Sequence, residues 1–271
     1  MTNPLLNHTL VRSPDTEPKL WLLVLHGIYG SGRNWGALAR RLVDERPAWG
    51  ALLVDLRLHG GSLGFAGPHT LAAAAADVDR LVDETKFQAA AVIGHSFGGK
   101  VALTYALHHP EGLRQVWVAD STLSVRPPSG SAWRIIEIVR SLPQSWASRE
   151  EFADALARHG YERPVGMWLA MNLERRDGAL VWRIDWDGME ELLRDYFRTD
   201  LWQVIENPPE GVDVHVIKAT ESDAIDAEDV KRIQAAEKAT GRVSLHPIEG
   251  GHWINTENPD GVLRLLASQL P

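Results

Sequence analysis

The chain has 271 residues, 44% of them hydrophobic and 24% charged, which is typical of a globular protein that folds as one large domain or as a domain with an insertion. The absence of cysteine excludes disulfides, thiolate catalysis and thiolate metal sites, and it is compatible with the reducing cytoplasm that we expect as the location. A net charge of -8 without a long basic run argues against nucleic acid as a partner, and the lack of a signal peptide or a long apolar stretch argues against export and membrane insertion.

The first 120 residues alternate between short apolar runs and amphipathic segments. After an edge strand near residues 9–12, the apolar runs predict strands at 19–25, 49–56, 89–93 and 115–119. Between them, helices are predicted at 34–45, at 70–84 and from the turn at 94–99 to about residue 110. The runs are apolar throughout, so both faces of the sheet should be covered. This pattern predicts an α/β fold with a doubly wound, mostly parallel sheet and helices on both faces.

Residues 121–207 interrupt this alternation after the strand that ends at Asp120. Helical spacing predicts helices at 132–141, 148–159, 164–175 and 188–204, and this stretch shows no strand signal. Ligands bind to such sheets outside the carboxyl ends of the strands, so an insertion at this point should cover the binding crevice. We therefore expect a helical lid over residues 121–207, on a core formed by residues 1–120 and 208–271.

The alternation resumes after the linker at residues 207–209. Strands are predicted at 212–219 and 242–248. Asp226 and Gly241 are typical caps for the beginning and the end of the helix between these strands. A closing helix is predicted at 258–269.

A glycine-rich turn, Gly94-His95-Ser96-Phe97-Gly98, joins the strand at 89–93 to the following helix. Glycine is needed on both sides of the serine because a Cβ atom there would collide across so tight a bend. A G-x-S-x-G motif between an apolar strand and a helix is the context of a nucleophile elbow, which exposes the serine hydroxyl above the carboxyl edge of the sheet. Ser96 is therefore the candidate nucleophile.

A serine nucleophile needs a base to take its proton and a carboxylate to orient that base. His252 is the candidate base, because it follows the last predicted strand on a glycine pair that lets the loop bend toward Ser96. Two acids compete for the third position. Asp120 ends the strand after the elbow, and Asp223 follows the next strand along the chain.

Backbone N–H groups are expected to bind the oxyanion, one from Phe97 after the nucleophile and one from Ile28 in the loop after the first central strand, with the N–H of Tyr29 as an alternative. Six of the 11 tryptophans lie between Trp133 and Trp202, where they form either the core of the lid or an aromatic-lined pocket. The side chains that we expect to contact the substrate are those of Tyr29, Trp168, Met171 and Trp253.

Five segments resemble the α/β-hydrolase superfamily, and most of all its small lidded esterase and thioesterase-like branch: LHGIYGSGRNW (25–35), DLRLHGGS (55–62), GHSFGGKVAL (94–103), VAD (118–120) and GGHWINTENP (250–259). The resemblance implies a serine esterase that cleaves an ester or thioester of a small to medium acyl group through an acyl-enzyme, without a metal or an organic cofactor. It also bears on the acid. In this superfamily, the acid that follows the later of these two strands usually lies three residues after a glycine at the strand end. Here Ala219 replaces that glycine, and Ser222 falls on the position. Asp120 is therefore favoured, with Asp223 as the alternative.

Other activities use the same residues. Carbon–carbon bond hydrolases and cofactor-free perhydrolases share this catalytic triad, and an acyltransferase differs in using an alcohol in place of water. A binding protein of the same fold without catalysis belongs to a different class of function. Absence of any turnover that depends on Ser96 would favour a binding protein.

Overall fold

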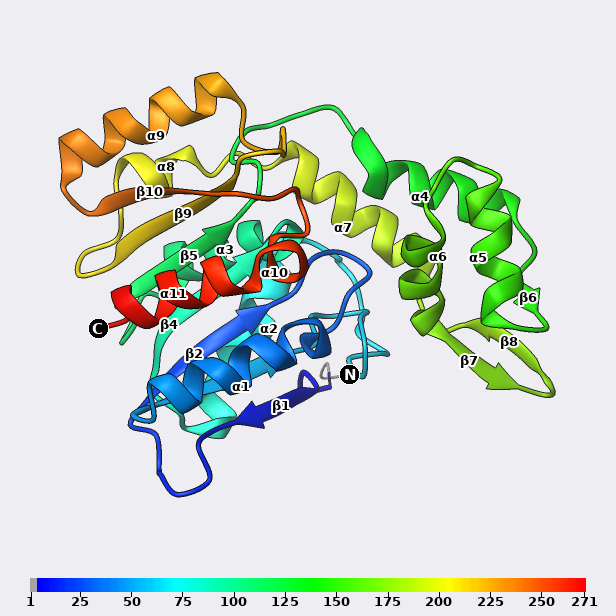
Figure 1. Ribbon diagram of the computed structural model, residues 1–271, viewed down its shortest axis with the longest axis horizontal. Coiled ribbons are helices and arrows are strands. Elements are labelled where there is room, and N and C mark those ends of the chain that lie inside the picture. Colours follow the sequence, from blue (N-terminus) through cyan, green and yellow to red (C-terminus); the bar gives the residue numbers. More distant parts are fainter. Residues whose placement is uncertain (1–3) are drawn as a thin grey trace.

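The computed structural model describes residues 4–271; residues 1–3, which begin the predicted core segment 1–120, lie outside the described residues. A seven-stranded sheet in the order β1-β3-β2-β4-β5-β9-β10 forms the centre (Figure 1). Its strands are β1 (His8–Val11), β2 (Leu20–Leu25), β3 (Trp49–Val54), β4 (Ala89–His95), β5 (Gln115–Ala119), β9 (Asp213–Ala219) and β10 (Val243–Ile248). β1 is antiparallel to β3, and the other neighbouring strands are parallel. The predicted mostly parallel sheet is confirmed.

Helices cover both faces of the sheet, which is why its central strands are apolar throughout. Every residue of β3, β4 and β5 is buried. One face packs against α1 (Gly36–Glu45), which follows the short 3-10 helix η1 (Gly32–Trp35), and against α11 (Pro259–Gln269). The other face packs against α2 (Leu71–Thr85), α3 (Phe97–His108) and α9 (Ala227–Thr240). Within residues 4–271, no helix has the length and apolarity to cross a membrane.

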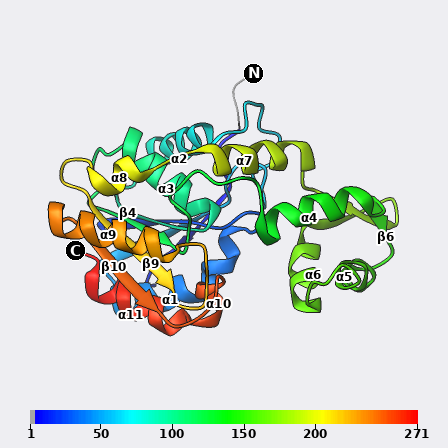
Figure 2. The same cartoon turned by 90° about the horizontal axis from the view of Figure 1, so that it is seen from above.

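Residues 121–207, which lie between β5 and β9, are here called the inserted segment. Its helices are α4 (Gly130–Ser141), α5 (Arg149–Ala157), α6 (Arg163–Leu169), η2 (Ala170–Asn172), α7 (Trp186–Arg198) and α8 (Trp202–Glu206). Figures 1 and 2 show α4, α5 and α6 set to one side of the sheet, while α7 runs back to the core.

The inserted segment also contains a three-stranded antiparallel sheet that the sequence analysis did not expect. Its strands are β6 (Ser145–Trp146), β7 (Leu173–Arg176) and β8 (Ala179–Trp182), in the order β6-β8-β7. The expected absence of strands was therefore wrong, and the predicted helix at 164–175 ends early because its last residues form β7. Asp177 and Gly178, with φ of 50° and 87°, make the two-residue turn between β7 and β8.

The predicted helix at 188–204 is also divided, into α7 and α8. The break lies between Arg198 and Trp202, at the end of α7. There the ammonium group of Lys100, from α3, donates hydrogen bonds to the carbonyl oxygens of Tyr196 and Thr199 at 2.8 and 2.6 Å. A cation that binds the last carbonyls of a helix stabilises its end, so Lys100 supplies a physical reason for the break.

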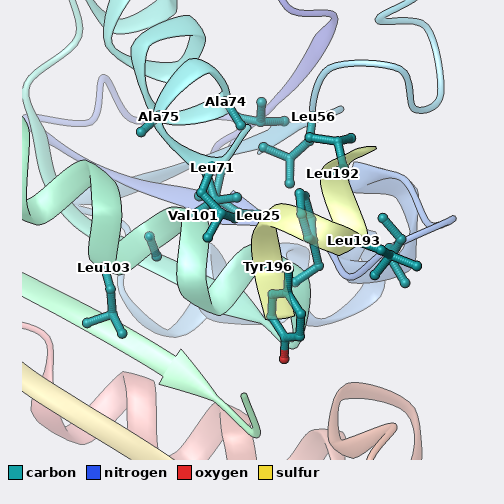
Figure 3. Close-up of a cluster of buried hydrophobic side chains, with 14 of the residues drawn as sticks. Leu25, Leu56, Leu71, Ala74, Ala75, Val101, Leu103, Leu192, Leu193 and Tyr196 are labelled. Carbon is teal, nitrogen blue, oxygen red and sulfur yellow. The ribbon is translucent and has the colours of Figure 1, made fainter. Parts of the chain in front are cut away.

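Helix α7 ties the inserted segment to the core. Its Leu192 and Tyr196 lie beside Leu71 of α2 and Val101 of α3 in one buried cluster (Figure 3). Lys100 reinforces this contact, because its third hydrogen bond, at 3.0 Å, goes to the carbonyl oxygen of Ser124 near the beginning of the inserted segment. Both ends of the segment are thus held against α3.

Candidate active site

Ser96 lies in the sharp turn between β4 and α3. Its φ of 51° and ψ of -117° are a strained combination for a residue with a side chain. The neighbouring glycines allow this turn: a Cβ atom on Gly94 would collide with the carbonyl of Gly98, and one on Gly98 would collide with the carbonyls of Leu25 and His26. The expected elbow geometry is present, with the half-buried serine at its apex.

The register of the sheet brings Asp120 beside this turn. β4 and β5 pair with His95 opposite Ala119, so that Ser96 and Asp120 leave neighbouring strands at the same level. The N–H of Ser96 donates to the carbonyl of Ala119 at 3.0 Å. The next strand, β9, ends at Ala219, whose N–H donates to Oδ1 of Asp120 at 3.1 Å. The strand register and these hydrogen bonds therefore fix the positions of Ser96 and Asp120 without any contact from His252.

His252 completes a hydrogen-bonded chain. It lies in the loop between β10 and the short helix α10 (Ile254–Glu257). Its Nε2 is 3.0 Å from Oγ of Ser96, and its Nδ1 is 2.7 Å from Oδ2 of Asp120. A carboxylate accepts, so Nδ1–H donates to Asp120 and Nε2 is free to accept the serine proton. This is the arrangement that general-base activation of a serine requires.

Asp120 is fully buried and ionised. Burial by itself raises the pKa of this carboxyl group, but hydrogen bonds from His252, Ser222 and the N–H of Ala219 outweigh it and lower the pKa below its ordinary value. Asp223, by contrast, is exposed, and its backbone carbonyl accepts a hydrogen bond from Arg126 at 3.4 Å. The structure thus brings Asp120, and not Asp223, to the histidine.

His95, the residue before Ser96 in the turn, is a site residue that was not among the predicted ones. Its Nε2–H donates to the backbone carbonyl of His252 at 2.6 Å. The ring is buried, and burial together with the neighbouring His252 lowers its pKa to about 3. His95 is therefore a neutral donor that holds the loop of His252. Its place before Ser96 was visible in the sequence, but its partner lies 157 residues away.

The loop after β2 carries one of the two expected oxyanion donors. His26 fixes this loop: its Nδ1–H donates to the carbonyl of Gly27 at 2.7 Å, and its Nε2 accepts from the N–H of Leu56 at 3.0 Å. A Cβ atom on Gly27 would be 3.6 Å from Cβ of Ser96, so the loop runs close to the nucleophile. Ile28 follows and lines the cavity that contains Ser96.

The other expected donor, the N–H of Phe97, belongs to the first residue of α3. An N–H in the first turn of a helix has no acceptor within the helix and points along the positive end of its dipole. Both expected N–H groups thus belong to backbone that flanks Ser96.

A cavity of about 370 Å³ opens above Ser96 and His252. Residues of the core line it, and the inserted segment contributes side chains such as Ile135, Trp168 and Phe197. The charged residues Arg126 and Asp223 also line it. The size suits a small-molecule ligand.

Of the four residues expected to contact the substrate, three border this cavity and Met171 does not. Trp168 and Trp253 line the cavity, with ring centroids 4.7 Å apart in an edge-to-face arrangement. Tyr29 borders it too, but its ring is buried, and its hydroxyl donates to the carbonyl of Ala132 in α4 at 2.7 Å. Met171 is 58% exposed and borders a separate polar cavity with Arg183, outside the cavity of Ser96.

The sheet topology and the strand–serine–helix turn define a hydrolase of the α/β fold. The model of the alpha/beta hydrolase family matches residues 22–265, and the chain belongs to this family. The chain is 29% identical over 255 residues to the sn-1-specific diacylglycerol lipase ABHD11 of Danio rerio. The aligned region covers 90% of this chain and 75% of that lipase.

Two further comparisons are informative. The chain is 28% identical over 170 residues to a 2-succinyl-6-hydroxy-2,4-cyclohexadiene-1-carboxylate synthase of Klebsiella pneumoniae, covering 60% of this chain and 61% of the relative. The solved structure of a marine microorganism esterase superposes with a TM-score of 0.83 at 26% identity, covering 98% of this chain and 99% of the esterase. With the family match, the similarities to the lipase and to the esterase identify the protein as a hydrolase.

Proposed function

We propose that the protein is a serine hydrolase that cleaves a carboxylic ester or thioester of a small to medium acyl group through an acyl-enzyme. The observation that carries this proposal is the hydrogen-bonded chain from Ser96 through His252 to the buried carboxylate of Asp120. Similarity to a diacylglycerol lipase and to an esterase supports an ester as the substrate class.

In the first half of the reaction, Oγ of Ser96 attacks the carbonyl carbon while Nε2 of His252 takes the hydroxyl proton. The carbonyl oxygen becomes an oxyanion, which accepts hydrogen bonds from the N–H groups of Ile28 and Phe97. Asp120 stabilises the imidazolium that forms. Nε2–H of His252 then protonates the leaving alcohol or thiol, and the acyl group remains on Ser96.

In the second half, His252 takes a proton from water, and the resulting nucleophile attacks the acyl carbon. Collapse of the second oxyanion releases the carboxylic acid and returns the proton to Ser96. No step needs a metal or an organic cofactor.

We further propose that residues 121–207 act as a lid on a core formed by residues 1–120 and 208–271. The segment begins directly after Asp120, and it supplies Ile135, Trp168 and Phe197 to the cavity above Ser96. Walls of this kind determine which acyl groups fit.

The test is hydrolysis of p-nitrophenyl esters from acetate to decanoate by the wild-type protein and by Ser96→Ala. We expect turnover in the wild type and its loss in the variant. Turnover that persists in Ser96→Ala would contradict the proposal. No turnover of any ester would also contradict it, and would favour a carbon–carbon bond hydrolase, a perhydrolase or a binding protein.

A further inference from the structure

A second cavity lies beside the one that contains Ser96. Its volume is about 220 Å³, and it lies between helix α6 and the core. We call it the α6 cavity. Pro164 and Val165 line it from the side of α6, and Trp35 lines it from the side of the core. It is thus a space between the inserted segment and the sheet, as the cavity of Ser96 is.

The two cavities share one wall. Gly27, Ile28, His95, Trp168 and Trp253 border both. The two tryptophans approach this wall from opposite sides, because Trp168 belongs to α6 and Trp253 follows His252 directly. Their rings meet edge to face at 4.7 Å, and Trp253 is 36% exposed. The wall between the α6 cavity and the reacting atoms therefore consists of these two aromatic rings in contact, together with Gly27, Ile28 and His95.

The chemistry of the two cavities differs. Arg126 and Asp223 border the cavity of Ser96, together with hydroxyl groups such as those of Thr122 and Ser129. The α6 cavity has no charged side chain among its described lining residues. The ring nitrogens of His26, which lines it, both make hydrogen bonds within the core, and Nε2 of His95 binds the carbonyl of His252. Asn34, Asn255 and Thr256 are the other polar lining residues. The rest of the lining is apolar, so an apolar group is the ligand that this cavity favours.

We infer that the α6 cavity is a second substrate subsite, which receives the apolar group of the ester past the Trp168–Trp253 wall. The inference rests on the proposed function and names the substrate class more closely: an ester with one compact apolar half and one polar half. At about 30 Å³ for each water-sized group, the volume accommodates about seven non-hydrogen atoms.

The subsite makes activity depend on chain length. Each methylene that enters an apolar site improves binding about fourfold. The value of kcat/KM should therefore rise along a homologous series and stop rising when the α6 cavity is full. The apolar half is either the acyl group or the alcohol, and two substrate series separate these cases. One series is p-nitrophenyl acetate through decanoate, and the other is the acetate esters of ethanol through decanol.

The test variant is Val165→Trp, which fills the α6 cavity from the lid side, and the control is Met167→Trp. Residue 167 is on the same helix, two positions further, is equally half-buried, and borders neither cavity. We expect Val165→Trp to lower kcat/KM of the longest esters by about tenfold or more in one series, with the shortest ester of that series changed less than about twofold. Met167→Trp should leave the length dependence of the wild type.

A binding measurement keeps this inference separate from the proposed catalysis. In the Ser96→Ala background, calorimetry with the preferred long ester should show binding that Val165→Trp weakens by about tenfold. Equal effects of Val165→Trp on short and long esters in both series would overturn the subsite. So would equal binding of the long ester with and without Val165→Trp. If binding depends on length but no Ser96-dependent turnover occurs, the subsite stands and the proposed reaction fails.

Discussion

Two of the three residues in the hydrogen-bonded chain have a left-handed backbone. The φ of Ser96 is 51° and that of Asp120 is 46°, although neither residue is glycine. The sheet compensates for this strain: the N–H of Ser96 donates to Ala119, and the N–H of Asp120 donates to Ile217 at 2.9 Å. Strained residues persist where the surrounding structure fixes them, and here the result is that both side chains face His252.

The identity of the acid is tested by comparing Asp120→Asn with Asp223→Asn. An amide at residue 120 no longer holds His252 in the required tautomer or stabilises its imidazolium form, so kcat should fall by about 1,000-fold or more. Asp223→Asn is the matched control and should change kcat less than about threefold, because its side chain is exposed. The measurement is kcat of both variants and the wild type from steady-state kinetics on one p-nitrophenyl ester. A larger loss for Asp223→Asn would show that the acid is assigned wrongly.

The buried His95 makes stability depend on pH. Its pKa is about 3 in the folded protein, whereas an unfolded histidine titrates near 6.5. Between these values the unfolded chain binds the extra proton, so the free energy of unfolding falls as the pH falls. From pH 7 to pH 5, this one group accounts for a loss of about 2 kcal/mol.

Urea unfolding of the wild type and of His95→Gln at pH 7 and pH 5 measures that loss. Glutamine keeps a donor for the carbonyl of His252 but does not titrate. We expect the stability of the variant to fall about 2 kcal/mol less than that of the wild type between the two pH values. The same fall in both proteins would mean that His95 is protonated in the folded state.

At the scale of elements, the sequence predicted the sheet better than the inserted segment. The strand at 115–119 was predicted with the bounds of β5, because a fully buried strand is a continuous apolar run. β6 and β7 are short strands with no such run, and the apolar run of β8 is only four residues long and half-exposed. Asp177-Gly178 was a readable hairpin signal between them, and the helical spacing of the preceding residues obscured it. The division of α7 from α8 could not be read, because it depends on a buried lysine from α3.

The same distinction applies to the site. Ser96, Asp120 and His252 were identifiable because each follows a strand, and parallel strands bring their carboxyl ends to one edge. The positions of Tyr29 and Met171 relative to the cavity depend on how α4 and η2 pack on the core, which no local pattern specifies. Hydrogen bonds between distant residues, such as the one from His95 to His252, are also invisible to local patterns.

At the scale of the whole molecule, the inserted segment and the core share one hydrophobic cluster. Leu192 and Tyr196 of α7 pack with side chains of α2 and α3 (Figure 3). Lys100 adds hydrogen bonds to both ends of the segment. Units that share a core unfold together, so we expect one cooperative transition for the whole chain.

Parallel urea titrations followed by far-ultraviolet circular dichroism and by tryptophan fluorescence test this expectation. The first reports mainly on the helices and the sheet. Tryptophan fluorescence reports more strongly on the inserted segment, because six of the 11 tryptophans lie between Trp133 and Trp202. We expect the midpoints to coincide, and Lys100→Met should lower both by the same amount. A fluorescence transition that precedes the dichroism transition would show that the segment unfolds by itself.

The central claim is that Ser96 is the nucleophile and that His252 activates it. The most direct measurement is the intact mass of the protein after treatment with a fluorophosphonate, followed by mapping of the modified peptide. We expect one adduct, on Ser96, in the wild type, none in Ser96→Ala, and much slower labelling of His252→Ala. Absence of an adduct on Ser96, or an adduct that persists in Ser96→Ala, would contradict the account.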